Sequence, residues 1–279
     1  MEISASQVKA LRDKTGLPMM DCKKALTEAN GNEEAAIEIL RAAGAKTMAG
    51  RTDRTTQEGR IVVFKDTKKN ITAIIELLCE SEPVSNNADF ELLANALAEQ
   101  LATGPGASTP EELLAQQFPN KPAGVTLQKF FDELVNKIRE VFRLSRIARI
   151  EGNASSYVHH NKHVAAAISI EGEDCTAARD ICMQIASMNP PYLQKNDIEP
   201  ATIEKEREIL AKQAKERNPN KPDNILQNII NGLMEKYYAE RVLLAQPFVK
   251  DQTKTVQQIC DDSKIKIKKM IRWVIGQEN

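Results

Sequence analysis

Three observations predict an α+β protein built from several modules. Three short amphipathic stretches occupy residues 8–41, a β-branched hairpin pattern followed by a helical pattern occurs twice, and two charged helical stretches meet at a proline-containing break. The chain has 279 residues, enough for two or three domains. We expect an N-terminal three-helix module, a duplicated hairpin–helix core, an antiparallel helical hairpin of coiled-coil type and a C-terminal helical module.

The first module is predicted over residues 1–44. Gly16 and Gly31 stand where helices end, and Asn32 stands where the third helix needs an N-cap. Three short helices at this spacing predict a ubiquitin-associated-like module, a shape that docks onto other proteins. Met19 and Met20 follow a proline, and two adjacent side chains on a helix cannot both face the core. We therefore expect at least one of them to form a soft contact patch beside Arg12.

A polar, basic stretch at residues 45–59 has no apolar period and is predicted to be a linker. The first core subdomain follows at 60–152. Its β-branched runs at 61–64 and 71–80 flank a polar loop, which predicts a hairpin, and 88–102 has helical spacing. Apolar residues three or four apart predict one long helix over 127–152.

The same order returns in the first part of the second subdomain, residues 153–200. Residues 155–172 predict a hairpin, and 175–188 predict the helix after it. This is a repeat of pattern rather than of residues, and it is the reason for expecting a duplicated core.

The segment 201–241 is predicted to be the helical hairpin, because NPNKP interrupts two helical stretches. They cover residues 201–217 and 223–241. Residues 242–279 form the C-terminal module and return to the core. There we expect an extended segment, a helix capped near Thr253 or Thr255, and a short strand.

Composition excludes several classes of function. Net charge is −1, which argues against nucleic acid as the main partner. We expect no membrane span, since no run of 18 apolar residues exists, and the N-terminus lacks a secretion signal. The five cysteines are odd in number and form no C-x-x-C pair, so we expect free thiols in a reducing cytoplasm.

The sequence offers little for catalysis. Neither glycine-rich phosphate-binding motif is present, so we expect no bound nucleotide or other cofactor. His159, His160 and His163 could suggest a metal site, yet no further ligand lies nearby in sequence, and a loop that touches a partner is the better interpretation. Glu80 and Glu82 could suggest an acid–base pair, but a solvated turn is favoured because no nucleophile is adjacent. We expect neither an enzyme nor a metal protein.

Four segments carry a resemblance that covers nearly the whole chain. They are LRDKTGLPMMDCKKALTEANGN, SYVHH, IASMNPPYL and QPFVKDQTKTVQQI. Together they closely resemble the elongation factor Ts family. The resemblance implies a factor that binds elongation factor Tu and lets GDP leave by disturbing the Mg²⁺ and phosphate region.

The resemblance also implies contact residues. The partner would be held through its GTPase domain and its C-terminal part, with the three-helix module docking on the GTPase domain. The residues carried over by the match are Arg12, Met19, Met20, Ser81, Glu82, Pro83, Val84, His159 and Val249.

One departure stands at residues 81–87. Many family members have Thr-Asp-Phe-Val-Ala-Lys-Asn there, with the phenylalanine as a wedge, whereas this chain has SEPVSNN. Glu82 keeps the charge, and Pro83 keeps only a small apolar surface. Since a Phe buries roughly 150–250 Å², the smaller wedge could cost about 1–2 kcal/mol. A divergent paralogue that binds elongation factor Tu without efficient exchange is the alternative.

The helical hairpin could touch the partner or form a homodimer.

Overall fold

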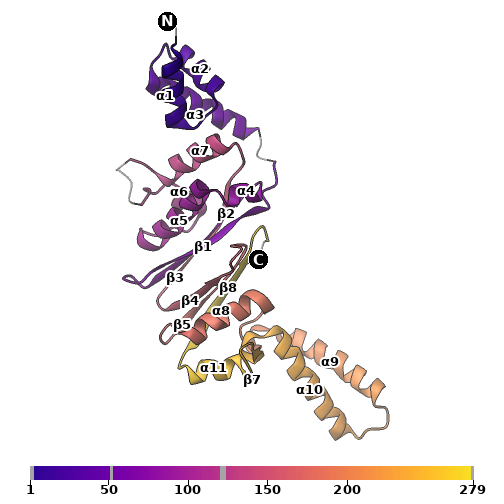
Figure 1. Ribbon diagram of the computed structural model, residues 1–279. Helices are drawn as coiled ribbons and strands as arrows, with labels where there is room; N and C mark the ends of the chain where they lie inside the picture. The colour runs from indigo at the N-terminus through magenta and orange to yellow at the C-terminus, as the bar shows by residue number, and fades with distance from the viewer. Residues whose placement is uncertain (1–2, 51–52, 120–123, 278–279) are drawn as a thin grey trace. The chain divides into compact units, whose positions relative to one another are not determined.

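The computed structural model describes residues 3–50, 53–119 and 124–277 and has a mixed α+β fold (Figure 1). The chain divides into two compact units. The N-terminal unit contains Met1–Ile150, His160–His163 and Val274–Asn279, and the C-terminal unit contains Glu151–His159 and Val164–Trp273.

Three helices open the chain: α1 (Ala5–Thr15), α2 (Met19–Glu28) and α3 (Glu33–Ala49). Gly16 ends α1 with a φ of 69°, a conformation that favours glycine, and the Asn32 side chain caps α3 by accepting the Ala35 N–H. Leu11, Cys22 and Leu26 lie in the small core between the helices. The helix α3 extends into the segment predicted to be a linker.

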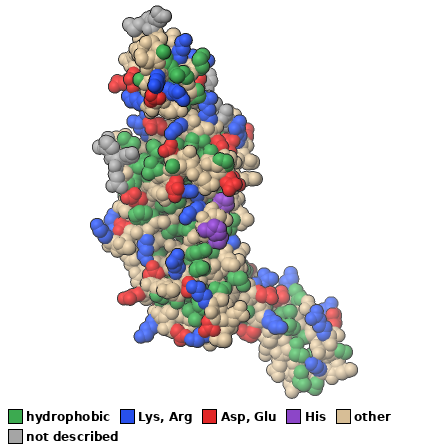
Figure 2. Space-filling view, in the orientation of Figure 1, with side chains coloured by type: hydrophobic (Ala, Val, Ile, Leu, Met, Phe, Trp, Pro, Cys, Tyr) green, Lys and Arg blue, Asp and Glu red, His purple; other side chains and the backbone are tan. Residues whose placement is uncertain are grey.

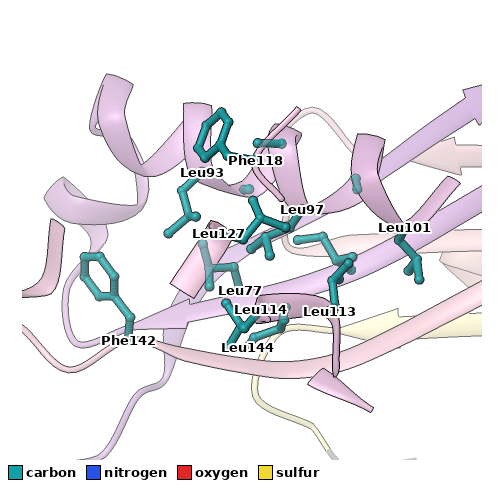
Figure 3. Close-up of a cluster of buried hydrophobic side chains, with 14 of the residues drawn as sticks. Leu77, Leu93, Leu97, Leu101, Leu113, Leu114, Phe118, Leu127, Phe142 and Leu144 are labelled. Carbon is teal, nitrogen blue, oxygen red and sulfur yellow. The ribbon is translucent and has the colours of Figure 1, made fainter. Parts of the chain in front are cut away.

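The first sheet has the strand order β1–β2–β3, with β1 (Glu58–Asp66), β2 (Ile71–Cys79) and β3 (Arg143–Glu151). The strands β1 and β2 form the predicted antiparallel hairpin. The helix α5 (Ala88–Thr103) packs on them, and Figure 3 shows Leu93, Leu97 and Leu101 of α5 in the same buried cluster as Leu77 of β2. Two short helices, α4 (Glu82–Ser85) and α6 (Pro110–Leu114), flank α5.

The predicted long helix over 127–152 is wrong. The helix α7 covers only Leu127–Ile138, and residues 143–151 form β3. Arg139 ends α7 in the left-handed region, with a φ of 63°, where glycine or asparagine would be the usual signal. The strand is stabilised by long-range contacts, since it pairs with β2 and Arg146 binds the buried Glu76. Apolar spacing alone cannot reveal such tertiary stabilisation.

The second sheet has the order β4–β5–β8, with β4 (Ala154–Val158), β5 (Val164–Glu171) and β8 (Lys266–Val274). The helix α8 (Thr176–Met188) packs on β4 and β5. The predicted hairpin followed by a helix is therefore present in each half. The third strands differ in origin, because β3 follows α7 whereas β8 comes from the end of the chain.

The helices α9 (Pro200–Arg217) and α10 (Asp223–Arg241) pack against each other as the predicted helical hairpin. Short elements precede and follow this helical hairpin in the chain: η1 (Lys195–Asp197), η2 (Leu243–Ala245), β6 (Pro247–Phe248) and β7 (Asp251–Thr255). The helix α11 (Val256–Asp262) begins after Thr255, whose hydroxyl accepts the Gln258 N–H. Of the two predicted caps, Thr255 is therefore the one used.

Candidate partner-binding site

The turn between α1 and α2 exposes two adjacent methionines. Met19 and Met20 are 44% and 62% exposed, because they stand at the first two positions of α2 with its core-facing residues one turn later. The Pro18 carbonyl accepts the Asp21 and Cys22 N–H groups and fixes the start of the helix. Arg12 is exposed in the last turn of α1. The turn thus presents apolar, polarisable side chains and one cation to solvent.

The segment after β2 forms a single helical turn, α4. Pro83 stands in its first turn, where a missing N–H costs nothing and the fixed φ suits a helix. The Glu82 carbonyl accepts the Ser85 hydroxyl at 2.8 Å and the Asn86 N–H at 3.2 Å. The side chains of Glu82 and Pro83 are exposed, while Val84 packs against the core. The charged side chain of Glu82 and the apolar side chain of Pro83 are therefore both exposed on a helical turn whose backbone is closed by hydrogen bonds.

Two carboxylates next to this turn, those of Glu140 and Glu80, each accept hydrogen bonds from the chain segment that carries the other. Glu140 Oε2 accepts the N–H groups of Ser81 at 3.1 Å and Glu80 at 3.2 Å, and its Oε1 accepts the Ser81 hydroxyl at 2.5 Å. In return, the Glu80 carboxylate accepts the Val141 N–H at 2.8 Å and pairs with Arg54 at 3.0 Å. Glu80 is therefore engaged with the segment before β3 and with Arg54.

Cys79 directly precedes Glu80 in the chain. Burial, and after it the charge of Glu140, raises the pKa of the Cys79 thiol to about 12. The thiol is therefore neutral at physiological pH, and its Sγ donates to the Ser81 carbonyl at 3.3 Å.

The three histidines lie at the turn between β4 and β5. His159 is half-buried, and its Nδ1 lies 3.0 Å from the Tyr157 hydroxyl. His163 Nε2 lies 3.7 Å from the carboxylate of Glu58. Figure 2 shows histidine side chains reaching the surface in the face that is in view. Among the residues that the structure describes, no group of three or more histidines, cysteines and carboxylates is arranged to hold a metal ion.

Val249 projects from the turn between β6 and β7 and is 43% exposed. Its backbone N–H donates to the side chain of Gln184 on α8. The next residue, Lys250, turns back and pairs with Asp180 at 2.7 Å. The turn therefore exposes the apolar side chain of Val249, while the charge of Lys250 is paired with Asp180 on α8.

Two residues that support these turns escape prediction from the sequence. Glu140 and Gln184 lie 59 and 65 positions from Ser81 and Val249, their hydrogen-bonding partners. A lone glutamate after a helix and a glutamine inside one carry no motif. The only available signal is a polar residue on the buried face of α8, at Gln184.

Comparison with known proteins decides the family. A profile of the family described as Elongation factor TS matches residues 80–277. The chain is also similar to elongation factor Ts of Thioalkalivibrio sulfidiphilus, with 36% identity over 99% of this chain and 93% of that protein. The corresponding protein of Corynebacterium urealyticum is 39% identical, over 98% of both chains.

The chain belongs to the elongation factor Ts family. Members of this family act in translation elongation as nucleotide exchange factors and not as enzymes that make or break covalent bonds. The similarity to whole relatives includes the N-terminal helices, which precede the range matched by the family profile. Within residues 3–50, 53–119 and 124–277, no helix has both the length and the apolar character needed to cross a membrane.

Proposed function

We propose that this elongation factor Ts relative binds elongation factor Tu with GDP bound and accelerates GDP release by disturbing the Mg²⁺ and phosphate site. GTP then enters the vacated site. Membership of the family supports the partner. We propose that the protein acts in the cytoplasm, where bacterial translation takes place.

The observation that carries the mechanism is the exposed pair Glu82 and Pro83 on a closed helical turn. A carboxylate brought near a Mg²⁺ site competes for the cation or repels the phosphates. An apolar ring beside it displaces partner side chains. The turn can transmit such a push because its backbone is held by hydrogen bonds on both sides.

We further propose that the contact with elongation factor Tu is shared among separate surfaces. The ubiquitin-associated-like module would dock on the GTPase domain through Arg12, Met19 and Met20, which are exposed around one turn. Ser81 and Val84 would support Glu82 and Pro83 there. His159 and Val249 would contact the partner from the C-terminal unit, each on a turn with a defined backbone.

Exchange by this route is a coupling between two ligands. If binding of the factor weakens GDP by some ratio, GDP weakens the factor by the same ratio. Each ~1.4 kcal/mol of coupling corresponds to about tenfold in affinity. The alternative is a paralogue that binds without releasing nucleotide, and it is favoured by the absence of an aromatic ring at position 83.

The helical hairpin is a candidate surface for self-association. Ile209 on α9 and Ile225 on α10 are large apolar side chains exposed to solvent. We propose a homodimer through this hairpin as one use of these side chains. Sedimentation of the protein across a range of concentrations tests it, and a monomer at every concentration would exclude it.

Release of a fluorescent GDP analogue from elongation factor Tu, in the presence of Mg²⁺, tests the proposed function. We expect strong acceleration at substoichiometric amounts of this protein, because a catalytic exchange factor is regenerated in each cycle. A stable complex without acceleration would support the paralogue. Absence of any complex would contradict both.

A further inference from the structure

Glu140 joins the exposed turn at Glu82 and Pro83 to the rest of the N-terminal unit. Its two carboxylate oxygens together accept three hydrogen bonds from Glu80 and Ser81, directly before the turn. The geometry points to Glu140 as a positioning residue for nucleotide exchange, whose carboxylate fixes the direction in which Glu82 and Pro83 meet the partner. This inference rests on the proposed function, since it assigns a role within the same reaction.

The turn needs an external anchor because α4 is too short to hold its own direction. The helix has four residues, and a single helical turn is unfavourable on its own. Ser81 stands at its N-cap position, yet the Ser81 side chain makes no capping hydrogen bond and donates to Glu140 instead. The usual local device for starting a helix is therefore replaced by a contact with a distant residue.

The anchor itself is fixed on both sides. Glu140 directly follows Arg139, whose left-handed conformation ends α7. The Val141 N–H donates to Glu80, so each carboxylate holds the backbone that carries the other. Arg54 pairs with Glu80 and offsets the charge of two neighbouring carboxylates. The end of β2 and the start of β3 are thereby held together beneath α4.

A rigid support matters because a push on a partner is lost if the pushing group yields. A displacement of about 1 Å at a working group can cost about a hundredfold in rate. Loss of Glu140 should therefore reduce the maximal rate of GDP release rather than the affinity, since the methionine turn and Val249 lie on other segments.

The test compares Glu140→Ala and Glu140→Gln in GDP release across a range of factor concentrations. We expect Glu140→Ala to lower the maximal rate by about tenfold, because a charged acceptor serving three donors is lost. The half-saturating concentration should stay within about twofold of wild type. Glu140→Gln should recover much of the rate, since its amide oxygen can accept the two N–H groups and its NH₂ can donate to the Ser81 hydroxyl.

Asp66→Ala is the matched control. Asp66 is also a carboxylate that accepts two backbone N–H groups, those of Lys68 and Lys69, at the opposite end of the β1–β2 hairpin. We expect this variant to keep the wild-type exchange rate. An unchanged maximal rate in Glu140→Ala, or an effect confined to the half-saturating concentration, would overturn the positioning role.

Amide hydrogen exchange on the free protein separates this inference from the proposed function. We expect the Glu80 and Ser81 amides to be protected in wild type, to exchange faster in Glu140→Ala and to be unaffected in Asp66→Ala. Equal protection in Glu140→Ala and wild type would overturn the inference whatever the activity. A wild-type protein that does not accelerate GDP release from elongation factor Tu would instead contradict the proposed function.

Discussion

Gln184 Oε1 accepts the backbone N–H of Val249 at 3.0 Å, which holds the exposed turn between β6 and β7 from below. Gln184 is fully buried, and its Nε2 donates to Gln246 Oε1 at 2.9 Å and to the Pro247 carbonyl at 3.1 Å. Both ends of this amide are therefore used, and all three partners lie in or beside the same turn. The buried Gln184 therefore fixes the backbone that carries the exposed Val249 side chain.

Replacing Gln184 with Leu should destabilise the protein. The Val249 N–H, the Gln246 amide and the Pro247 carbonyl would all lose a partner, which costs about 1–3 kcal/mol in the free energy of unfolding. Urea denaturation measures the change. Gln257→Leu is the control, because Gln257 is exposed and its bond to Asp261 should contribute little. Equal stability of Gln184→Leu and wild type would contradict the supporting role.

A double substitution Met19→Ala and Met20→Ala should weaken binding to elongation factor Tu without unfolding the module. Both side chains are exposed, so the core keeps its contacts, whereas a buried interface would lose about 1–3 kcal/mol for each truncated methionine. Calorimetric titration measures the affinity, with circular dichroism as the check of folding. Leu92→Ala removes a similarly exposed side chain outside the proposed contacts and should bind normally. Unchanged affinity of the double variant would exclude the methionine turn from the interface.

The ion pair of the buried Glu76 with the partly buried Arg146 should be a strong determinant of stability. Two nitrogens of Arg146 donate to the two Glu76 oxygens at 2.7 and 2.8 Å, and Glu76 is only 1% exposed. Glu76→Ala removes the carboxylate that faces the partly buried Arg146 guanidinium, so we expect a loss of about 3–5 kcal/mol in the free energy of unfolding. Replacing both residues with apolar ones should recover much of it.

The matched control for that prediction is the exposed pair of Lys195 and Glu235, whose loss should cost at most about 1 kcal/mol. Urea denaturation of both sets of variants checks the difference. Similar effects of Glu76→Ala and Glu235→Ala would contradict the assignment.

The buried thiols should make the protein less stable at alkaline pH. Burial raises the pKa of Cys182 to about 12 and that of Cys260 to about 11, from an ordinary value of 9.0. Above pH 9 the unfolded chain releases these protons and the folded chain keeps them. Stability from the neutral thiols is therefore complete below pH 9 and is lost as pH rises towards 11–12.

We expect Cys182→Ala to lower the pH dependence of the unfolding free energy between pH 9 and 10.5, by up to about 1.4 kcal/mol per pH unit. The decisive quantity is the slope, since the substitution also changes packing. The same slope in variant and wild type would show that this thiol titrates normally.

The sequence predicted what local pattern determines. Caps such as Asn32 and Thr255, the two β-branched hairpins and the break at NPNKP are local signals, and each element lies where it was expected. The strand β3 was not predicted, because Arg139 ends α7 without glycine and the following strand depends on β2 and on the Glu76–Arg146 pair. The helix α3 also continues to Ala49, inside the segment predicted to be a linker. Long-range partners of this kind leave no pattern in one sequence.

The candidate site divides in the same way. Exposure at the methionine turn follows from helix geometry and was expected, whereas the helical turn α4 around Pro83 was not predicted from the sequence. The supporting residues Glu140 and Gln184 could not be found, since each depends on a contact between segments that are distant in sequence.

The most direct test of the proposed role of the Glu82–Pro83 turn is the rate of GDP release from elongation factor Tu. The rate is measured with wild type, Pro83→Phe and Pro110→Phe. Pro110 also stands in the first turn of a short helix of the same unit and serves as the control. We predict that wild type accelerates GDP release, that Pro83→Phe accelerates it further through its larger apolar surface, and that Pro110→Phe behaves like wild type. Equal rates for wild type and Pro83→Phe would contradict the claim that this turn acts on the Mg²⁺ and phosphate site.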